Sequence, residues 1–567
     1  MDAARTHHHG EWKGRISLKK KASLTLSIPQ RLEGLSVLLL VIAALLYLWA
    51  SAKSLYVFPV ADSYRWYGDE TWMLLAWKNL LRHGTLSVPI ALGSTLEHSP
   101  GLMLGSPWLS AIIYGLPQLL APFDTDIVAI GRTVSFIVGI ACIIMIAWST
   151  RRLQVGVGIS AVAIIVLLTT RTFTFATHSA RYDMITGMAL VWFVGVCAVL
   201  LFSPGSPKKI HYFLLGFFSV IVALTISPHL EILLPPVALY IAWRSRAFSS
   251  WRHMLGLLGG VVLAGAIVVL LHLWGSHDLS LWSGIRSDNQ YGSVIARLPF
   301  LKFFSYSAQS HQLWAKRFYL WQEAPAFGII LILVVISEFA LLLLRRQHSA
   351  TGFVTVCLLL ALLSAIFFQS TLPYYLAHLL PLTTLAFALH VNEWRHSKIL
   401  KPAMAIVSLA LCAIVITIWR PELTHAGYIG RRMEEANTAA VQAAFEEESR
   451  TREATAHRPL VLAQAPAIHE LLRDTSVRLM SESFLFFPQV REPIDSTLAR
   501  EHVSFIVDYN HPMSLEYQQA VERTTPIFYR IGPFLDRSVD YFHDTTTELD
   551  TLTLYEVVSN DSVSAIR

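Results

Sequence analysis

Long apolar segments constrain the fold of this chain more than any other feature. A helix needs about 20 mainly apolar residues to cross the hydrocarbon core of a bilayer, so each such segment is a candidate transmembrane helix. The segments occupy approximately residues 33–55, 127–149, 155–177, 184–202, 209–227, 229–243, 254–272, 325–344, 351–369, 373–391 and 402–419. They predict a polytopic α-helical membrane protein with about 11 transmembrane helices.

The charged residues support this prediction and orient the chain. Only 15% of the residues are charged, against about 25% in soluble domains. The net charge of +6 does not indicate nucleic-acid binding, because the basic residues lie in short clusters between apolar segments. Cytoplasmic loops of membrane proteins are rich in Lys and Arg. All the clusters face the cytoplasm only if the proline-bearing stretch 105–122 is an interfacial or re-entrant helix on the outer side.

This orientation divides an integral, multi-pass protein of the plasma (inner) membrane into three parts. Residues 1–32 form a basic cytoplasmic tail, and residues 33–419 form a transmembrane module with outer loops at 56–126 and 273–324. Residues 420–567 lie outside the cell membrane. Their apolar runs resemble short β-strands and alternate with helical stretches. The β-like runs lie at 459–463, 475–480, 503–508, 526–530 and 551–558. This pattern predicts a small extracytoplasmic α/β domain.

The sequence predicts no certain cofactor. The four cysteines lie inside apolar segments and form no CxxC motif, so neither a disulfide framework nor a zinc site is indicated. The C-terminal part has no glycine-rich phosphate loop, so nucleotide binding is unsupported.

Two adjacent carboxylates, Asp69 and Glu70, lie in the first outer loop within the sequence WYGDETWMLL. Residues 70–83 have the pattern of an interfacial helix, and an Asp before such a helix is a good N-cap. A cap explains one carboxylate and leaves the other unexplained. The pair is therefore either a helix start alone or part of a functional site at the membrane surface.

A second polar feature on the outer side is the turn HSARYD at 178–183. Arg181 and Asp183 are costly there unless they pair or face a cavity, and such residues are functional candidates by default. The alternative is a purely structural Arg–Asp pair. His378, in LPYYLAHLLPL, fits either a satisfied core histidine or a site residue.

The order of these motifs resembles the type C (GT-C) glycosyltransferases, in the superfamily of the protein O-mannosyltransferases and the bacterial aminoarabinose transferases of lipid A. The resemblance covers about residues 33–391. It rests on GDETW at 68–72, the PWLSAIIYGL helix, the IGRTVSFIVG span, RYD at 181–183 and YYLAHLLP at 374–381.

The resemblance implies a GT-C fold and a sugar donor linked to polyprenyl phosphate. The sugar would move to a glycan, lipid or protein acceptor on the outer face, and membrane lipids would be further partners. Asp69 matches the family's catalytic carboxylate, and Asp183 a second acidic position near the reaction centre. Related transferases often carry a Lys before the second interfacial helix, whereas this chain has Glu97 and His98. Phosphate binding then falls to Arg181, to basic residues of the 273–324 loop, or to a divalent metal.

The expected chemistry assigns roles to three of the candidate residues. Asp69 takes the proton of the acceptor hydroxyl, Glu70 orients Asp69 or the acceptor, and Arg181 stabilises the departing phosphate. One carboxylate opposite the leaving group predicts inversion at the anomeric carbon. The remaining candidates for substrate contact are His178, Tyr182, Glu97, His98, Tyr375 and His378.

Two other functions remain open on the sequence. The chain could be a transporter or flippase of a lipid-linked sugar, or a non-catalytic membrane subunit with an exported binding domain. Transporters commonly show internal repeats and mid-membrane polar groups. No clear repeat is present, and the acids cluster at the outer edge.

Overall fold

A computed structural model describes the transmembrane part and the C-terminal sheet in separate stretches. The strands are described by their backbone, and all statements below concern the described residues. These are 28–55, 127–168, 170–203, 209–225, 250–276, 325–343, 350–368, 376–394, 460–463, 478–481, 505–509, 525–535 and 549–556, with the single residues 74, 113, 114, 117 and 237.

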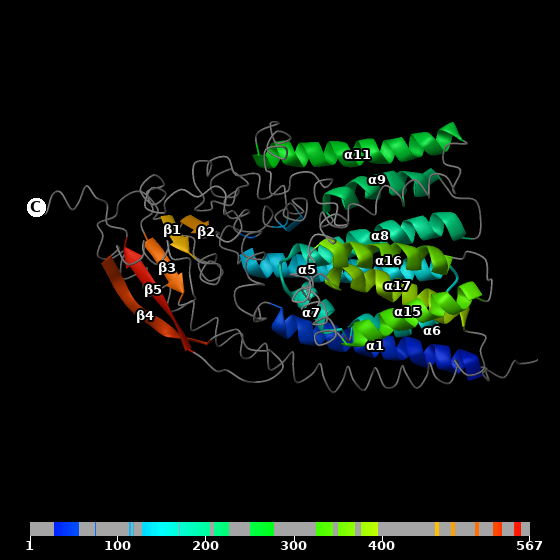
Figure 1. The fold of residues 1–567 in the computed structure, drawn as a ribbon, viewed down its shortest axis with the longest axis horizontal. Coiled ribbons are helices and arrows are strands. Elements are labelled where there is room, and N and C mark those ends of the chain that lie inside the picture. Colours follow the sequence, from blue (N-terminus) through cyan, green and yellow to red (C-terminus); the bar gives the residue numbers. More distant parts are fainter. Residues whose placement is uncertain are drawn as a thin grey trace, which may run out of the picture.

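Helices dominate the described part and run side by side in one bundle (Figure 1). Three stretches are long and apolar enough to cross a membrane: Gly34–Ala52, Ile127–Arg152 and Asp183–Phe202. The chain is thus a polytopic helical membrane protein. The helices are α1 (Ile28–Ser54), α5 (Ile127–Arg152), α6 (Val157–Leu168), α7 (Arg171–His178), α8 (Tyr182–Phe202), α9 (Lys209–Thr225), α11 (Trp251–Ser276), α15 (Pro325–Leu343), α16 (Ala350–Phe368) and α17 (Leu376–Glu393).

Helix α1 covers nearly all of the first predicted span, 33–55, and begins before it. Helix α1 begins at Ile28, so the last residues of the predicted tail 1–32 belong to the helix. Two predicted spans, 229–243 and 402–419, lie outside the described residues apart from Val237. The total of about 11 spans therefore stays a prediction.

The predicted single span at 155–177 is broken into α6 and α7, which are bent by 76° relative to each other. The apolar run stops at Leu168, and three of the next four residues are threonines. Thr170 is extended, with φ −83° and ψ 121°, and its hydroxyl donates to the Val166 carbonyl at 3.0 Å. Threonine hydroxyls compete for backbone groups in this way, which is a physical reason for the break.

Helix α8 is the centre of the bundle and packs against α5, α9, α16 and α17. Its contact with α17 is close because Gly187 has no side chain: a Cβ there would lie 2.8 Å from the Ala377 carbonyl oxygen. Pro381 lies inside α17 and has no N–H to donate to that carbonyl four residues earlier. The glycine therefore accommodates a carbonyl that the proline leaves out of the helix hydrogen bonding.

The C-terminal strands form one sheet with the order β2-β1-β3-β5-β4. The first three are parallel, and β5 and β4 join antiparallel. Each strand overlaps one of the predicted β-like runs. The bounds are β1 (Leu460–Ala463), β2 (Arg478–Ser481), β3 (Phe505–Tyr509), β4 (Thr525–Leu535) and β5 (Leu549–Glu556).

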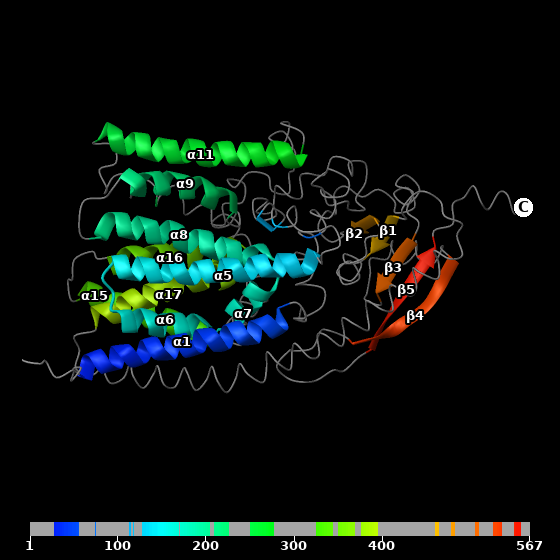
Figure 2. The same ribbon diagram turned by 180° about the vertical axis from the view of Figure 1, so that it is seen from behind.

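The sheet lies beyond the end of the bundle that carries α7, as two opposite views show (Figures 1 and 2). The predicted topology puts the 178–183 turn and residues 420–567 on the same side of the membrane, and this arrangement agrees with it. The separate domain and its sidedness stay predictions.

Candidate functional site at one end of the helix bundle

The turn between α7 and α8 is short and fully buried. Helix α7 ends at His178 and α8 begins at Tyr182. Ser179 and Arg181 are both extended, with φ −122° and −112°. Ser179, Ala180 and Arg181 expose none of their surface. The sequence prediction of a turn with almost no loop is therefore confirmed.

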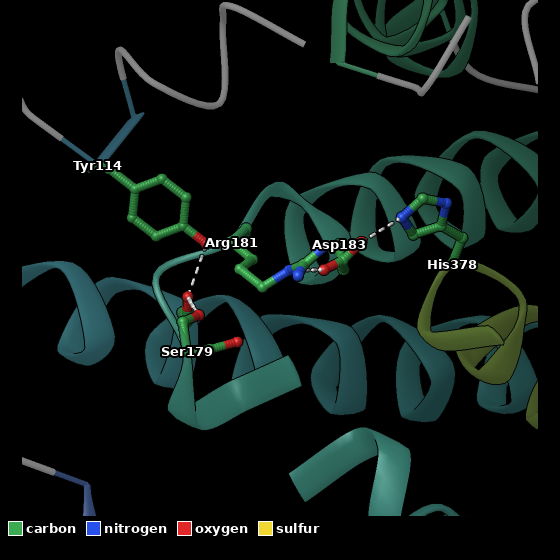
Figure 3. Close-up of polar contacts among 6 residues, drawn as sticks. Tyr114, Ser179, Arg181, Asp183 and His378 are labelled. Carbon is green, nitrogen blue, oxygen red and sulfur yellow. Dashed lines mark hydrogen bonds and ion pairs between the residues drawn. The ribbon is translucent and has the colours of Figure 1, made fainter. Parts of the chain in front are cut away.

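Asp183 links the turn to α17 through two contacts. Arg181 Nε donates to Asp183 Oδ2 at 2.7 Å, and His378 Nε2 lies 2.9 Å from Asp183 Oδ1 (Figure 3). All three side chains are buried. A charge-assisted contact of this kind is stronger than a neutral hydrogen bond. The structure thus joins three sequence-predicted site residues, two of them 195 positions apart.

Tyr114 comes from the predicted interfacial helix 105–122 and docks on the same turn. Its hydroxyl donates to the Arg181 carbonyl and lies 2.6 Å from Ser135 Oγ of α5. Ser135 Oγ in turn donates to the Ser179 carbonyl at 2.6 Å. Tyr114 is completely buried. These bonds tie Tyr114 and helix α5 to two backbone carbonyls of the turn.

Leu74 is a second anchor of the predicted first outer loop. It is helical, as expected for residues 70–83, and completely buried. A Cβ on Gly131 would lie 2.7 Å from Leu74 Cδ2 and 2.8 Å from Ala180 Cβ. Gly131 therefore lets the outer loop, α5 and the turn meet at one point.

His178 holds α7 against α1 and α5. Its Nδ1 lies 2.7 Å from the Thr174 carbonyl, and its ring meets those of Tyr47 and Phe136 edge-on, with centroids 6.1 Å apart. The neighbouring Thr177 Oγ1 lies 2.5 Å from Tyr47 OH. These contacts favour a supporting role for His178 over the predicted contact with substrate.

Several predicted residues are not placed by the structure. Asp69, Glu70, Glu97, His98 and Tyr375 lie outside the described residues. The backbone of Tyr182 opens α8, and its side chain is also outside the description. No group of three or more His, Cys, Asp and Glu side chains in the described part is arranged to hold a metal ion.

Sequence reasoning missed Arg132, Tyr114 and Ser135. Arg132 is the sixth residue of α5 and is 1% exposed. A cation inside an otherwise apolar segment was a usable signal. Tyr114 and Ser135 gave none, because their importance lies in contacts between distant segments.

The fold matches known structures, although the sequence matches no protein-family model and no curated protein. The crystal structure of ArnT from Cupriavidus metallidurans bound to undecaprenyl phosphate matches with a TM-score of 0.53 and 13% identity. The match covers 92% of this chain and 98% of that one. This chain has the GT-C fold. The apo structure of ArnT covers the same shares, with a TM-score of 0.48 and 15% identity.

The GT-C fold confirms the architecture that the motif resemblance implied. The match spans nearly the whole of both chains, so it includes the transmembrane bundle. At this identity the likeness concerns the fold and leaves the subfamily open.

Proposed function

We propose that this protein is a membrane glycosyltransferase that moves a sugar from a polyprenyl-phosphate donor to an acceptor on the outer face, with inversion. The GT-C fold supports this proposal, and so does the undecaprenyl phosphate bound to ArnT. The observation that carries it is the docking of the first outer loop, through Leu74 and Tyr114, onto the turn that holds Arg181 and Asp183.

The Leu74 contact limits how far the predicted base can be from the turn. Asp69 is five residues before Leu74, and an extended chain of that length spans no more than about 18 Å. If residues 70–74 are helical, as predicted, Glu70 lies only about 6 Å along the axis from Leu74. Leu74 itself is against Gly131 and Ala180, the neighbours of Arg132 and Arg181. We therefore expect the two carboxylates to lie within reach of the buried cations.

The reaction needs a base on one side of the sugar and a cation on the other. Asp69 takes the proton of the acceptor hydroxyl as the acceptor oxygen forms its bond to the anomeric carbon. The bond from that carbon to the phosphate oxygen breaks, and its electron pair stays on the phosphate. Polyprenyl phosphate leaves with one more negative charge, which a guanidinium stabilises. A phosphate is already a weak base, so no general acid is needed.

Arg181 is our candidate for that guanidinium, and Asp183 is a positioning residue. Both Asp183 oxygens are bonded, one to Arg181 and one to His378. A carboxylate held in this way is a poor proton acceptor, so the catalytic role that the resemblance implied for Asp183 is replaced by orientation of Arg181. The Arg181 contact uses Nε, and a guanidinium has four further N–H donors.

A transferase assay with purified protein in liposomes tests the proposal. The substrates are a radiolabelled polyprenyl-phosphate sugar and a hydroxyl-bearing acceptor from the cell envelope. We expect free polyprenyl phosphate and labelled acceptor to form, and Asp69→Asn to lose at least about 100-fold in rate. Asp124→Asn, in the same predicted outer loop, is the matched control. Movement of the intact donor across the bilayer without cleavage would instead identify a flippase.

A further inference from the structure

The C-terminal sheet contains a topological switch point between β1 and β3. Strand β1 lies in the middle of the parallel part, with β2 on one side and β3 on the other (Figure 1). Strand β4 runs parallel to β3, because both pair antiparallel with β5. Connections between parallel strands are right-handed in nearly all proteins. We therefore expect the chain to leave β1 towards β2, and β3 towards β4, over opposite faces of the sheet.

A switch point of this kind is where open α/β sheets bind their ligands. The two connections diverge, and a crevice forms outside the carboxyl ends of the two strands. In this sheet the rule points to the carboxyl ends of β1 and β3. The proposed reaction uses residues of the bundle and of the first outer loop, so it gives this edge of the sheet no role.

Asp508 is the charged residue of β3 and lies at this edge. Strand β1 pairs with β3 as far as Ala463 and Val507, whereas β3 continues to Tyr509. Asp508 therefore lies one residue beyond the part of β3 that pairs with β1. On its other side it keeps β5 as a neighbour, where it pairs with Thr553. The register thus places a carboxylate at the switch point.

Two threonines of β5 share a face of the sheet with Asp508. Thr553 is directly opposite Asp508, and Thr551 belongs to the same face because side chains alternate along a strand. Opposite and diagonal neighbours on one face lie about 5–8 Å apart. Asp550, one residue before Thr551, belongs to the other face. One face of the sheet thus combines a carboxylate and two hydroxyl groups at its ligand-binding edge.

This combination fits a ligand that is rich in hydroxyl groups. A carboxylate accepts hydrogen bonds, and a threonine hydroxyl both donates and accepts, so together they match the neighbouring hydroxyls of a sugar ring. The charge of Asp508 disfavours a phosphate, and the connection 464–477 contains no glycine for a phosphate-binding loop. A calcium ion takes about six to eight oxygen ligands, which is more than these three residues supply.

We propose that the carboxyl edge of this sheet, at Asp508, Thr551 and Thr553, binds a sugar ring of the acceptor. This inference rests on the proposed function and makes the acceptor a carbohydrate-bearing molecule. The sheet lies beyond the end of the bundle that carries α7 (Figures 1 and 2), which is also the end with the candidate site. The sheet then holds the acceptor by a sugar that does not react, and the reacting hydroxyl is left for the bundle.

The test measures the KM for the acceptor and the KM for the donor separately, with full-length protein in liposomes. The donor is the radiolabelled polyprenyl-phosphate sugar. Two acceptor fractions are compared: envelope glycans and glycolipids, and envelope proteins stripped of carbohydrate. We expect the label in the carbohydrate fraction.

Asp508→Asn should raise the KM for this carbohydrate fraction by about 10- to 100-fold, the effect of losing one charge-assisted hydrogen bond. It should leave the KM for the donor unchanged. Asp550→Asn, on the other face of the same edge, is the matched control and should keep both KM values.

The outcomes separate this inference from the proposed function. Label in the protein fraction alone, or an unchanged acceptor KM in folded Asp508→Asn, overturns the inference and leaves the proposed function standing. An equal rise in Asp550→Asn also overturns it, because the effect would then not depend on the face of the sheet. If Asp508→Asn does not fold, an unchanged acceptor KM in Thr551→Val overturns the inference. Absence of donor cleavage and of transfer to either fraction overturns the proposed function, and this inference with it.

Discussion

Asp183→Asn should destabilise the protein strongly, because it leaves the Arg181 guanidinium buried beside a neutral partner. Removal of one member of a buried ion pair typically costs about 3–5 kcal/mol. Coulomb's law agrees, since two unit charges about 4 Å apart interact by about 4 kcal/mol at an effective dielectric constant of about 20. The short contacts and full burial of the pair place it in this class. The His378 contact adds to the loss.

The assay is thermal unfolding of the purified protein in detergent, followed by tryptophan fluorescence. A loss of this size should lower the apparent melting temperature by about 10 °C. The double variant Arg181→Met with Asp183→Leu removes both charges, and we expect it to regain most of the stability while remaining inactive. His378→Gln keeps an N–H donor and should lose only about 1 kcal/mol. If Asp183→Asn melts like the wild type, the buried pair is not what holds this turn.

Two further substitutions test how the site is positioned. Gly187→Ala would bring a methyl group 2.8 Å from the Ala377 carbonyl oxygen, so we expect a loss of about 1–3 kcal/mol and a lower kcat as His378 shifts. Gly265→Ala, where nothing lies within 4 Å, should leave both unchanged, and an equal effect at the two glycines would contradict the argument. Tyr114→Phe removes one donor to the Arg181 carbonyl, so it should cost about 1 kcal/mol in unfolding measurements; unaltered melting would show that the loop is anchored elsewhere.

The sequence predicted those features that depend on local patterns. The length of the apolar segments was enough to locate the helices, because a bilayer imposes a minimum length on each span. The RYD turn was predictable because two charges interrupt an apolar pattern over a few residues. Five alternating runs were enough to locate the strands.

Features that depend on tertiary contacts could not be predicted in the same way. No local pattern indicates that His378 reaches Asp183, or that Tyr114 serves the Arg181 carbonyl. The break between α6 and α7 has a local cause in Thr170, whose hydroxyl donates to the Val166 carbonyl, but hydropathy alone did not exclude a continuous span. Arg132 was predictable in principle, because it is a lone cation in an apolar segment.

The pairing of Arg181 with Asp183 also suits a site that must release its product. In the proposed mechanism, an uncompensated guanidinium would bind polyprenyl phosphate more tightly than the donor, because the product phosphate carries one more negative charge. Asp183 neutralises the Arg181 charge permanently, so the site binds the product phosphate less tightly. The same carboxylate keeps the Arg181 side chain in place before the donor binds, which avoids reorganisation during the reaction. In the proposed mechanism, a buried acid that transfers no proton thereby contributes to turnover.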